Sequence, residues 1–139
     1  MTDPHVVLKK LMMLREHASR IRARRPATAA EFGADVVQQD AIALNFLVAA
    51  QEAGDIAMHI ASDEGWGLPS SYREAFEILA NHGVIALDHA SELATVIFVR
   101  NLIAHGYSNL DPARFWGDLP RGLDSLDRFV AAIATRLEP

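Results

Sequence analysis

The sequence predicts an all-α protein, an antiparallel bundle of four to five helices in up-down order. Apolar residues recur at spacings of three and four, which is the repeat of one helical face. No segment shows sustained period-two alternation or an Asn-Gly hairpin turn. The connections between the predicted helices are short, which favours antiparallel neighbours. A chain of 139 residues fits one domain, and we expect it to span residues 1–139.

Two long helices are predicted in the first half of the chain. Pro4 after Asp3 suits a helix start, and apolar positions spaced by four and three continue from there, so a helix is expected at about residues 4–24. Residues 26–30 should form a connection. The next run is poor in Gly and free of Pro, and it predicts the longest helix at about residues 36–62.

Turn-forming residues separate the third helix from the second. Two glycines and a proline within residues 65–69 interrupt the helical pattern. Ser71 followed three residues later by Glu74 has the form of a capping box, which predicts a helix start. This short helix should end near residues 81–83, where an Asn and a Gly occur.

Two further helices are predicted toward the C-terminus. Asp88 is expected to cap the fourth helix, and Gly106 is expected to end it. Residues 111–112 should lie in an irregular stretch. Apolar positions spaced by four and three over residues 119–137 predict a last amphipathic helix.

Composition excludes several classes of protein. Half of the residues are hydrophobic and 22% are charged, as in a globular protein. Cysteine is absent, which excludes a disulfide framework and a thiolate zinc site. Charged residues precede any long apolar run at the N-terminus, and no uninterrupted apolar stretch approaches about 18 residues. We therefore expect a cytoplasmic protein with no signal peptide and no membrane partner.

The charge is divided unevenly along the chain. The net charge of −5 argues against a general nucleic-acid binder, because phosphate binding favours a basic surface. Residues 1–25 nevertheless carry seven basic and two acidic side chains, a balance of +5, so residues 26–139 carry −10. A basic stripe that contacts RNA or an acidic partner and a solvated helix face both fit this division.

The segment from Arg100 to Tyr107 contains the pattern R-x4-H-x-Y, formed by Arg100, His105 and Tyr107. An Arg five residues before a His arises by chance roughly half a time in a chain of this composition. Requiring a Tyr two residues after the His lowers that expectation to roughly 0.7%. The complete pattern is therefore informative, whereas the Arg and His alone are not.

This motif resembles the signature of HepT-like toxins, a branch of the HEPN superfamily. Asn101 is similar to the polar residue often found after the arginine in that family. Residues 40–45 with Gln51 and Asp55 resemble its second helix, and residues 69–76 resemble the start of its third. The resemblance covers roughly residues 5–137. It implies a HEPN-like bundle that dimerises through the motif-bearing face, so that two motifs share one cleft.

The resemblance also implies an activity and its control. HepT-like proteins are toxins of toxin–antitoxin systems that cleave RNA, and each has a minimal nucleotidyltransferase (MNT-type) antitoxin as its partner. Tyr107 is similar to the tyrosine to which that partner attaches AMP. A phosphate added there, near Arg100, would occupy the donors of that guanidinium and repel an RNA backbone.

The chemistry of the residues fits metal-independent RNA cleavage. His105 can exchange a proton with a ribose hydroxyl, because an ordinary histidine titrates near working pH. Arg100 can stabilise charge on the phosphate with its planar, permanently charged fork. On an ideal helix His105 is rotated by about 140° from Arg100. Either the helix loosens near Gly106, or a second protomer supplies the complementary group.

Structural roles compete with these assignments. Arg100 could pair with an acidic residue of a neighbouring helix, His105 could act as a cation at a helix C-terminus, and Tyr107 could be a packing aromatic. Trp66 and Trp116 are expected in or beside loops, with packing roles.

A polar stripe on the long helix is a second candidate. Helical spacing places its four members on one face: Asn45, Glu52, Asp55 and His59. Glu52 and Asp55 are predicted to support Arg100 or His105 across the bundle, while a solvated face remains the structural alternative. Asp55 and His59 are four residues apart, as two metal ligands on a helix can be, but the Glu-x-x-His pairs of di-iron bundles are absent. We predict no metal and no cofactor, and His59, His82 and His89 receive no role.

Three functions follow from these patterns. The leading one is a metal-independent endoribonuclease toxin with Arg100 and His105 as catalytic residues, Asn101 in support and Tyr107 as the modification site. The alternative is a non-catalytic nucleotide-binding or regulatory bundle that partners a nucleotidyltransferase. A metal-dependent bundle enzyme is the third.

Overall fold

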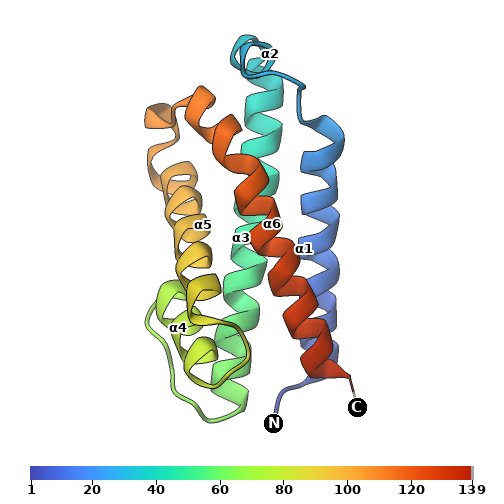
Figure 1. Ribbon diagram of the computed structural model, residues 1–139, viewed down its shortest axis with the longest axis vertical. Helices are drawn as coiled ribbons and strands as arrows, with labels where there is room; N and C mark the ends of the chain where they lie inside the picture. The colour runs from blue at the N-terminus through green and yellow to red at the C-terminus, as the bar shows by residue number, and fades with distance from the viewer. Residues whose placement is uncertain (139) are drawn as a thin grey trace.

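The computed structural model describes residues 1–138, and every regular element in that range is helical. Four long helices alternate in direction along the bundle, and both chain ends lie at the same end of it (Figure 1). These helices are α1 (Pro4–Arg24), α3 (Val36–Asp63), α5 (Leu87–Gly106) and α6 (Pro112–Leu137). The shorter elements are α2 (Ala29–Ala34), α4 (Tyr72–Asn81) and a 3-10 turn, η1 (Tyr107–Asn109). The predicted up-down helical bundle is confirmed.

Polar caps begin α1 and α4 where the sequence predicts them. The Asp3 carboxylate accepts a hydrogen bond from the His5 amide at 3.0 Å and so caps α1. The Ser71 hydroxyl accepts from the Glu74 amide at 3.1 Å, as in a capping box. The return bond differs from the expected one, because Glu74 accepts from the amide and the hydroxyl of Ser70 rather than from Ser71.

Three local predictions are wrong. Residues 26–30 were predicted to form a connection, but α2 begins within it at Ala29, and Thr28 caps this helix by accepting from the Glu31 amide. The N-cap of α5 is Ala86, so Asp88 lies in the first turn of the helix. Its negative charge interacts favourably with the helix dipole there, but its side chain does not cap the helix. The last helix begins at Pro112, capped by Asp111, and it therefore includes Trp116, which we expected in or beside a loop.

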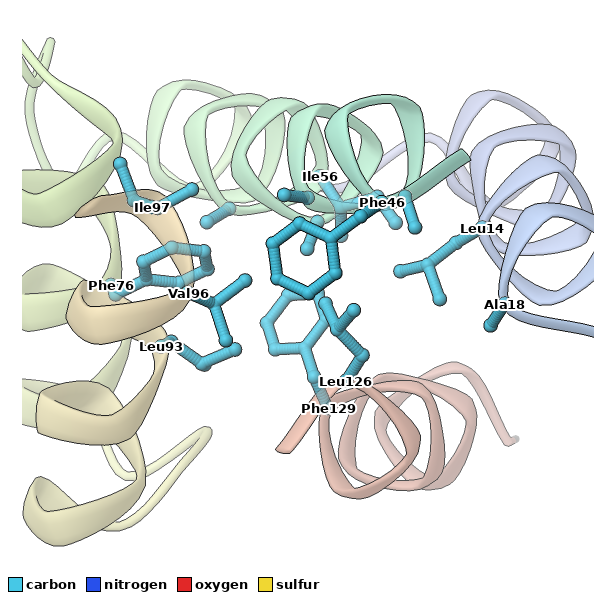
Figure 2. Packing of buried hydrophobic residues seen from close by; sticks show 14 of the residues in the cluster. Leu14, Ala18, Phe46, Ile56, Phe76, Leu93, Val96, Ile97, Leu126 and Phe129 are labelled. Carbon is cyan, nitrogen blue, oxygen red and sulfur yellow. The ribbon is translucent and has the colours of Figure 1, made fainter. Parts of the chain in front are cut away.

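The core fills the space between the four long helices. Phe46 from α3 and Phe129 from α6 lie at its centre, with Leu14, Val96 and Leu126 around them (Figure 2). All five side chains are buried. Burial of an aliphatic or aromatic side chain of this size stabilises the fold by about 1.5–3 kcal/mol. The periodic apolar residues of the four long helices thus pack into a core within one chain.

Helix α3 is the central helix of the bundle and contacts all the other α-helices. It is long and apolar enough to pass a compositional test for a membrane span, yet 56% of its most apolar window is buried inside the protein. The buried apolar residues of α3 therefore belong to the core, while Val37 and Leu44 are exposed.

Candidate functional site

Helix α5 directs Arg100 toward α3. The Arg100 guanidinium donates to the Gln51 side-chain oxygen through Nε at 3.3 Å and through Nη2 at 2.8 Å. Its remaining terminal nitrogen, Nη1, donates to the side-chain oxygen of Asn101 at 2.8 Å. Both acceptors are neutral amides. The guanidinium is therefore fixed in orientation, and no carboxylate of residues 1–138 neutralises its charge in a direct contact.

An aromatic ring completes the support of Arg100. The Tyr72 ring lies under the guanidinium of Arg100. The distance from Arg100 Cζ to the centroid of the ring is 5.7 Å, which is within the range of a cation–π interaction. The Tyr72 hydroxyl donates to Asp55 at 2.6 Å. Burial, followed by the hydrogen bond to Asp55, raises the pKa of Tyr72 to about 12. The phenol thus stays protonated and ties α4 to α3.

Tyr72 can occupy this place because residue 54 of α3 is glycine. A Cβ atom on Gly54 would lie closer than 3.0 Å to three carbons of the Tyr72 ring. Real side chains do not tolerate such contacts, so any larger residue at this position must displace the ring. Gly54 therefore determines the position of Tyr72, and through it the support of Arg100.

His105 lies on a different face of α5. The helix stays α-helical through Gly106, so it does not loosen between the two motif residues. The rotation of about 140° expected for a five-residue separation is therefore kept. His105 is exposed, and within residues 1–138 it forms no hydrogen bond or ion pair with Arg100. One protomer does not bring the two side chains together.

Tyr107 returns to the α3 side of the molecule. It is the first residue of η1, and its hydroxyl donates a short hydrogen bond to the Asp40 carboxylate near the start of α3. Burial, together with the hydrogen bond to Asp40 and its charge, raises the pKa of Tyr107 to about 12. The ring is still 40% exposed, so the hydroxyl is anchored but accessible to another molecule.

The polar stripe of α3 has partners other than the motif. Glu52 and Asp55 each lie 3.8 Å from the Lys10 ammonium of α1. Asn45 contacts the His17 ring at 2.8 Å. His59 lies 3.0 Å from Asp63, one turn along the same helix. Asp55 is linked to Arg100 through Tyr72, which contacts both residues. Glu52 is linked to Asp55 only through their shared partner Lys10.

The remaining aromatic and histidine side chains have packing roles. Trp66 stacks on His82 with ring centroids 4.0 Å apart, and Trp116 donates to the Pro26 carbonyl at 3.2 Å. His89 is buried and contacts the Ser125 carbonyl at 2.9 Å. Among the side chains of residues 1–138, no group of three potential ligands is placed to hold a metal ion.

An open hollow of about 500 Å³ lies beside Arg100. The start of α4 contributes Ser70, Ser71 and Arg73 to its wall, while α5 contributes Arg100 and Asn101. Arg73 is paired with Glu77 at 3.5 Å, so Arg100 and the N-terminus of α4 are the features of this hollow that favour an anion. A separate cleft between α5 and α6, about 220 Å³, contains none of the motif residues.

Three residues of the site come from outside the motif. Gln51 and Asp40 lie on one face of α3, eleven positions apart, and contact Arg100 and Tyr107 respectively. Tyr72 belongs to α4. In the sequence, Asp40, Gln51 and Tyr72 were noted only because their segments resemble helices of HepT-like proteins. That resemblance did not assign any of the three a role in the site.

Comparison with protein families identifies the chain. The model of the ribonuclease HepT-like family matches residues 14–133, a stretch that includes the motif and both helices that support it. This chain belongs to the HepT-like ribonuclease family. The HepT-like chain is 24% identical over 128 residues to the mRNA nuclease HepT of Shewanella oneidensis, covering 92% of this chain and 96% of that protein.

Solved structures share the fold of this HepT-like chain. One is a tri-AMPylated HEPN toxin of Shewanella oneidensis in complex with its MNT antitoxin, with a TM-score of 0.87, 24% identity, and coverage of 97% of this chain and 99% of that one. Another is the cytosolic protein YutE of Bacillus subtilis, of unknown function, with a TM-score of 0.85, 16% identity, and coverage of 99% and 92%. These likenesses show the HEPN fold.

Proposed function

We propose that this chain is the toxin of a toxin–antitoxin pair and acts in the cytoplasm as a metal-independent endoribonuclease. The observation that carries the proposal is that the Arg100 guanidinium is ordered by contacts with uncharged side chains. Its guanidinium is held in place by the neutral oxygens of Gln51 and Asn101, so its full charge is available to a phosphate.

In the proposed reaction the ribose 2′-oxygen attacks the adjacent phosphorus. The bond from phosphorus to O2′ forms and the bond from phosphorus to O5′ breaks, which leaves a 2′,3′-cyclic phosphate and a 5′-hydroxyl. His105 takes the 2′-proton as base or donates a proton to the leaving oxygen as acid. Arg100 stabilises the charge on the five-coordinate phosphate.

The active form is a homodimer, because one protomer separates Arg100 from His105. An exposed apolar face surrounds the motif: Phe98 of α5 is 61% exposed, and Val37 and Leu44 of α3 are 74% and 62% exposed. Phe98 lies seven residues before His105 and thus on nearly the same side of α5. A second copy that covers this face would bring His105 of one protomer toward Arg100 of its partner.

The proposed control is AMP attachment to Tyr107 by an MNT-type antitoxin. Tyr107 and Arg100 lie about 10 Å apart along the α5 direction, and both side chains point to α3. An adenylate on Tyr107 would place a negative phosphodiester beside the path of the RNA backbone, and like charges repel.

The proposal is tested by incubating purified protein with RNA in EDTA. His105→Ala should lower cleavage by about 10²–10⁴-fold, the usual contribution of a general acid or base. His5→Ala is the matched control, since His5 is also exposed and belongs to the first turn of α1, whose start lies at the opposite end of the bundle from the end of α5 (Figure 1). Equal cleavage by the parent and His105→Ala would overturn the catalytic assignment.

A further inference from the structure

The hydroxyl of Tyr107 has one polar partner in the structure, Asp40. The two residues are 67 positions apart in sequence and are brought together because α5 ends where α3 begins. The Leu110 amide donates to the Tyr107 carbonyl at 3.1 Å and closes η1, which fixes the backbone at Tyr107. The contact is therefore built by the tertiary fold.

Among the described residues that line the adjoining cavity, Asp40 is the only ionisable side chain beside Tyr107. A cavity of about 330 Å³ adjoins the two residues, and its other described lining side chains are apolar or neutral, Gln39 and Ser108 being the polar ones. Asp40 itself is exposed to solvent. No lysine, arginine or histidine faces the phenol in this cavity, so nothing there stabilises a phenolate.

An unassisted Tyr107 would be a poor nucleophile. Because the pKa of Tyr107 is raised to about 12, only about one phenol in 10⁵ is ionised at pH 7. A transfer reaction at this oxygen requires a group that removes the proton during attack. The carboxylate that accepts the hydrogen bond from this hydroxyl lies in the required position.

We propose that Asp40 is the general base for adenylylation of Tyr107. This inference rests on the proposed function, in which Tyr107 receives AMP from ATP. The Tyr107 oxygen forms a bond to the α-phosphorus, the bond between that phosphorus and the bridging oxygen breaks, and pyrophosphate leaves. The phenolic proton moves to the Asp40 carboxylate, which then releases it to solvent.

Asp40 also acts on the product. During the transfer it becomes a neutral carboxylic acid, so it does not repel the phosphodiester as that group forms. Once it has lost the proton, its carboxylate faces a negative phosphodiester and a tyrosine oxygen that can no longer donate. The hydrogen bond that anchors the ring to α3 is thereby replaced by repulsion. The modified side chain is then released from Asp40.

The test is the rate of AMP incorporation in a mixture of the full chain, its nucleotidyltransferase partner and ATP. Mass spectrometry of the Tyr107 peptide gives that rate. Asp40→Asn retains an oxygen that can accept the phenolic hydrogen bond but cannot take the proton, so the rate should fall about 10²-fold or more. The residual rate of this variant should rise about tenfold per pH unit between pH 7 and 9, as expected for a reaction through the phenolate.

Asp124→Asn is the control for loss of one negative charge. Asp124 is an exposed aspartate of α6 outside the motif, and this variant should incorporate AMP at the rate of the parent. Thermal melting verifies that both variants fold.

The outcomes separate the two proposals. The role of Asp40 would be overturned if Asp40→Asn incorporated AMP at the rate of the parent. It would also be overturned if the rate of this variant were lower but depended on pH as the rate of the parent does. Both results would leave the modification of Tyr107 intact. A parent chain that receives no AMP on Tyr107, or the same AMP mass in Tyr107→Phe, would overturn the modification itself.

Discussion

Arg100 shows how a charged side chain can be ordered without being neutralised. Its three donor nitrogens contact two neutral amide oxygens, and an aromatic ring lies beneath it. The nearest carboxylate in this network, Asp55, is engaged by Tyr72 and Lys10 instead. A phosphate that approaches Arg100 displaces weak neutral acceptors rather than a competing anion.

Gln51→Glu should therefore impair RNA binding. The new carboxylate would keep the shape of glutamine and pair with Arg100, so the phosphate must break a charge-assisted contact worth about 1.5–3 kcal/mol. We expect KM for RNA to rise by about 10–100-fold. Gln38→Glu is the matched control, since Gln38 lies on the same helix and contacts Arg24. A Gln51→Glu protein with the KM of the parent would contradict the role of neutral acceptors.

The two tyrosines of the chain should titrate together at high pH. The pKa of Tyr72 and that of Tyr107 are each raised to about 12. Tyrosinate absorbance of the folded protein should thus stay low at pH 10, where an unfolded chain is half ionised. Because the folded-state values are raised, the stabilisation is fully present below pH 10 and is lost as the pH rises toward 12. Half ionisation of the folded protein at pH 10 would contradict both hydrogen bonds.

The motif residues could be singled out as candidates from the sequence because they lie within eight residues of one another and form a recognisable pattern. Gln51 and Asp40 could not be assigned roles, since their contacts depend on the register between α3 and α5. Asp55 and Glu52 illustrate the same limit: helical spacing correctly places them on one face, but their direct ion-pair partner, Lys10, comes from α1. The pairing of side chains across helices is a property of packing.

At the scale of the element, Gly54 gives α3 a flat site for the Tyr72 ring. Glycine within a helix ordinarily costs about 1 kcal/mol relative to alanine. Here the absence of a side chain at Gly54 permits close contact between α3 and the Tyr72 ring of α4, next to Arg100.

Gly54→Ala should consequently destabilise the protein. Overpacking against the ring should cost about 1–3 kcal/mol and outweigh the gain in helix propensity. Gly117→Ala in α6 is the matched control, because its Cβ would meet no atom within 4 Å, and this change should stabilise the fold by about 0.5–1 kcal/mol. Urea denaturation measures both. A stabilised Gly54→Ala protein would show that Tyr72 does not pack as described.

Most helices could be predicted because periodicity and caps agree. Helix α2 was missed although Thr28 and Glu31 have capping-box spacing, because six residues are too short to show a helical period. The last helix was expected to start at about residue 119, whereas it begins at Pro112, and the buried Phe115, four residues before Leu119, continues the same apolar spacing. The short length of α2 thus limits what periodicity can reveal, whereas the start of α6 could have been found from Phe115.

At the scale of the whole molecule, the up-down order follows from each long helix burying one face in a common core. The charge division also has a structural explanation, because basic groups of α1 pair with acidic groups elsewhere: Lys10 with Glu52 and Asp55, and Arg22 with Asp127. The N-terminal basic excess is thus partly used within the bundle. The proposed site needs a second protomer to bring Arg100 and His105 together, and the exposed apolar side chains around the motif are consistent with that proposal.

Complementation between two inactive variants tests the proposed shared site most directly. Arg100→Ala and His105→Ala proteins are refolded together, native mass spectrometry verifies the mixed dimers, and RNA cleavage is measured in EDTA. In a mixed dimer, one of the two sites regains both side chains, so an equal mixture should recover about a quarter of the parental activity. Mixed dimers that remain as inactive as each variant alone would contradict a site built from Arg100 of one protomer and His105 of its partner.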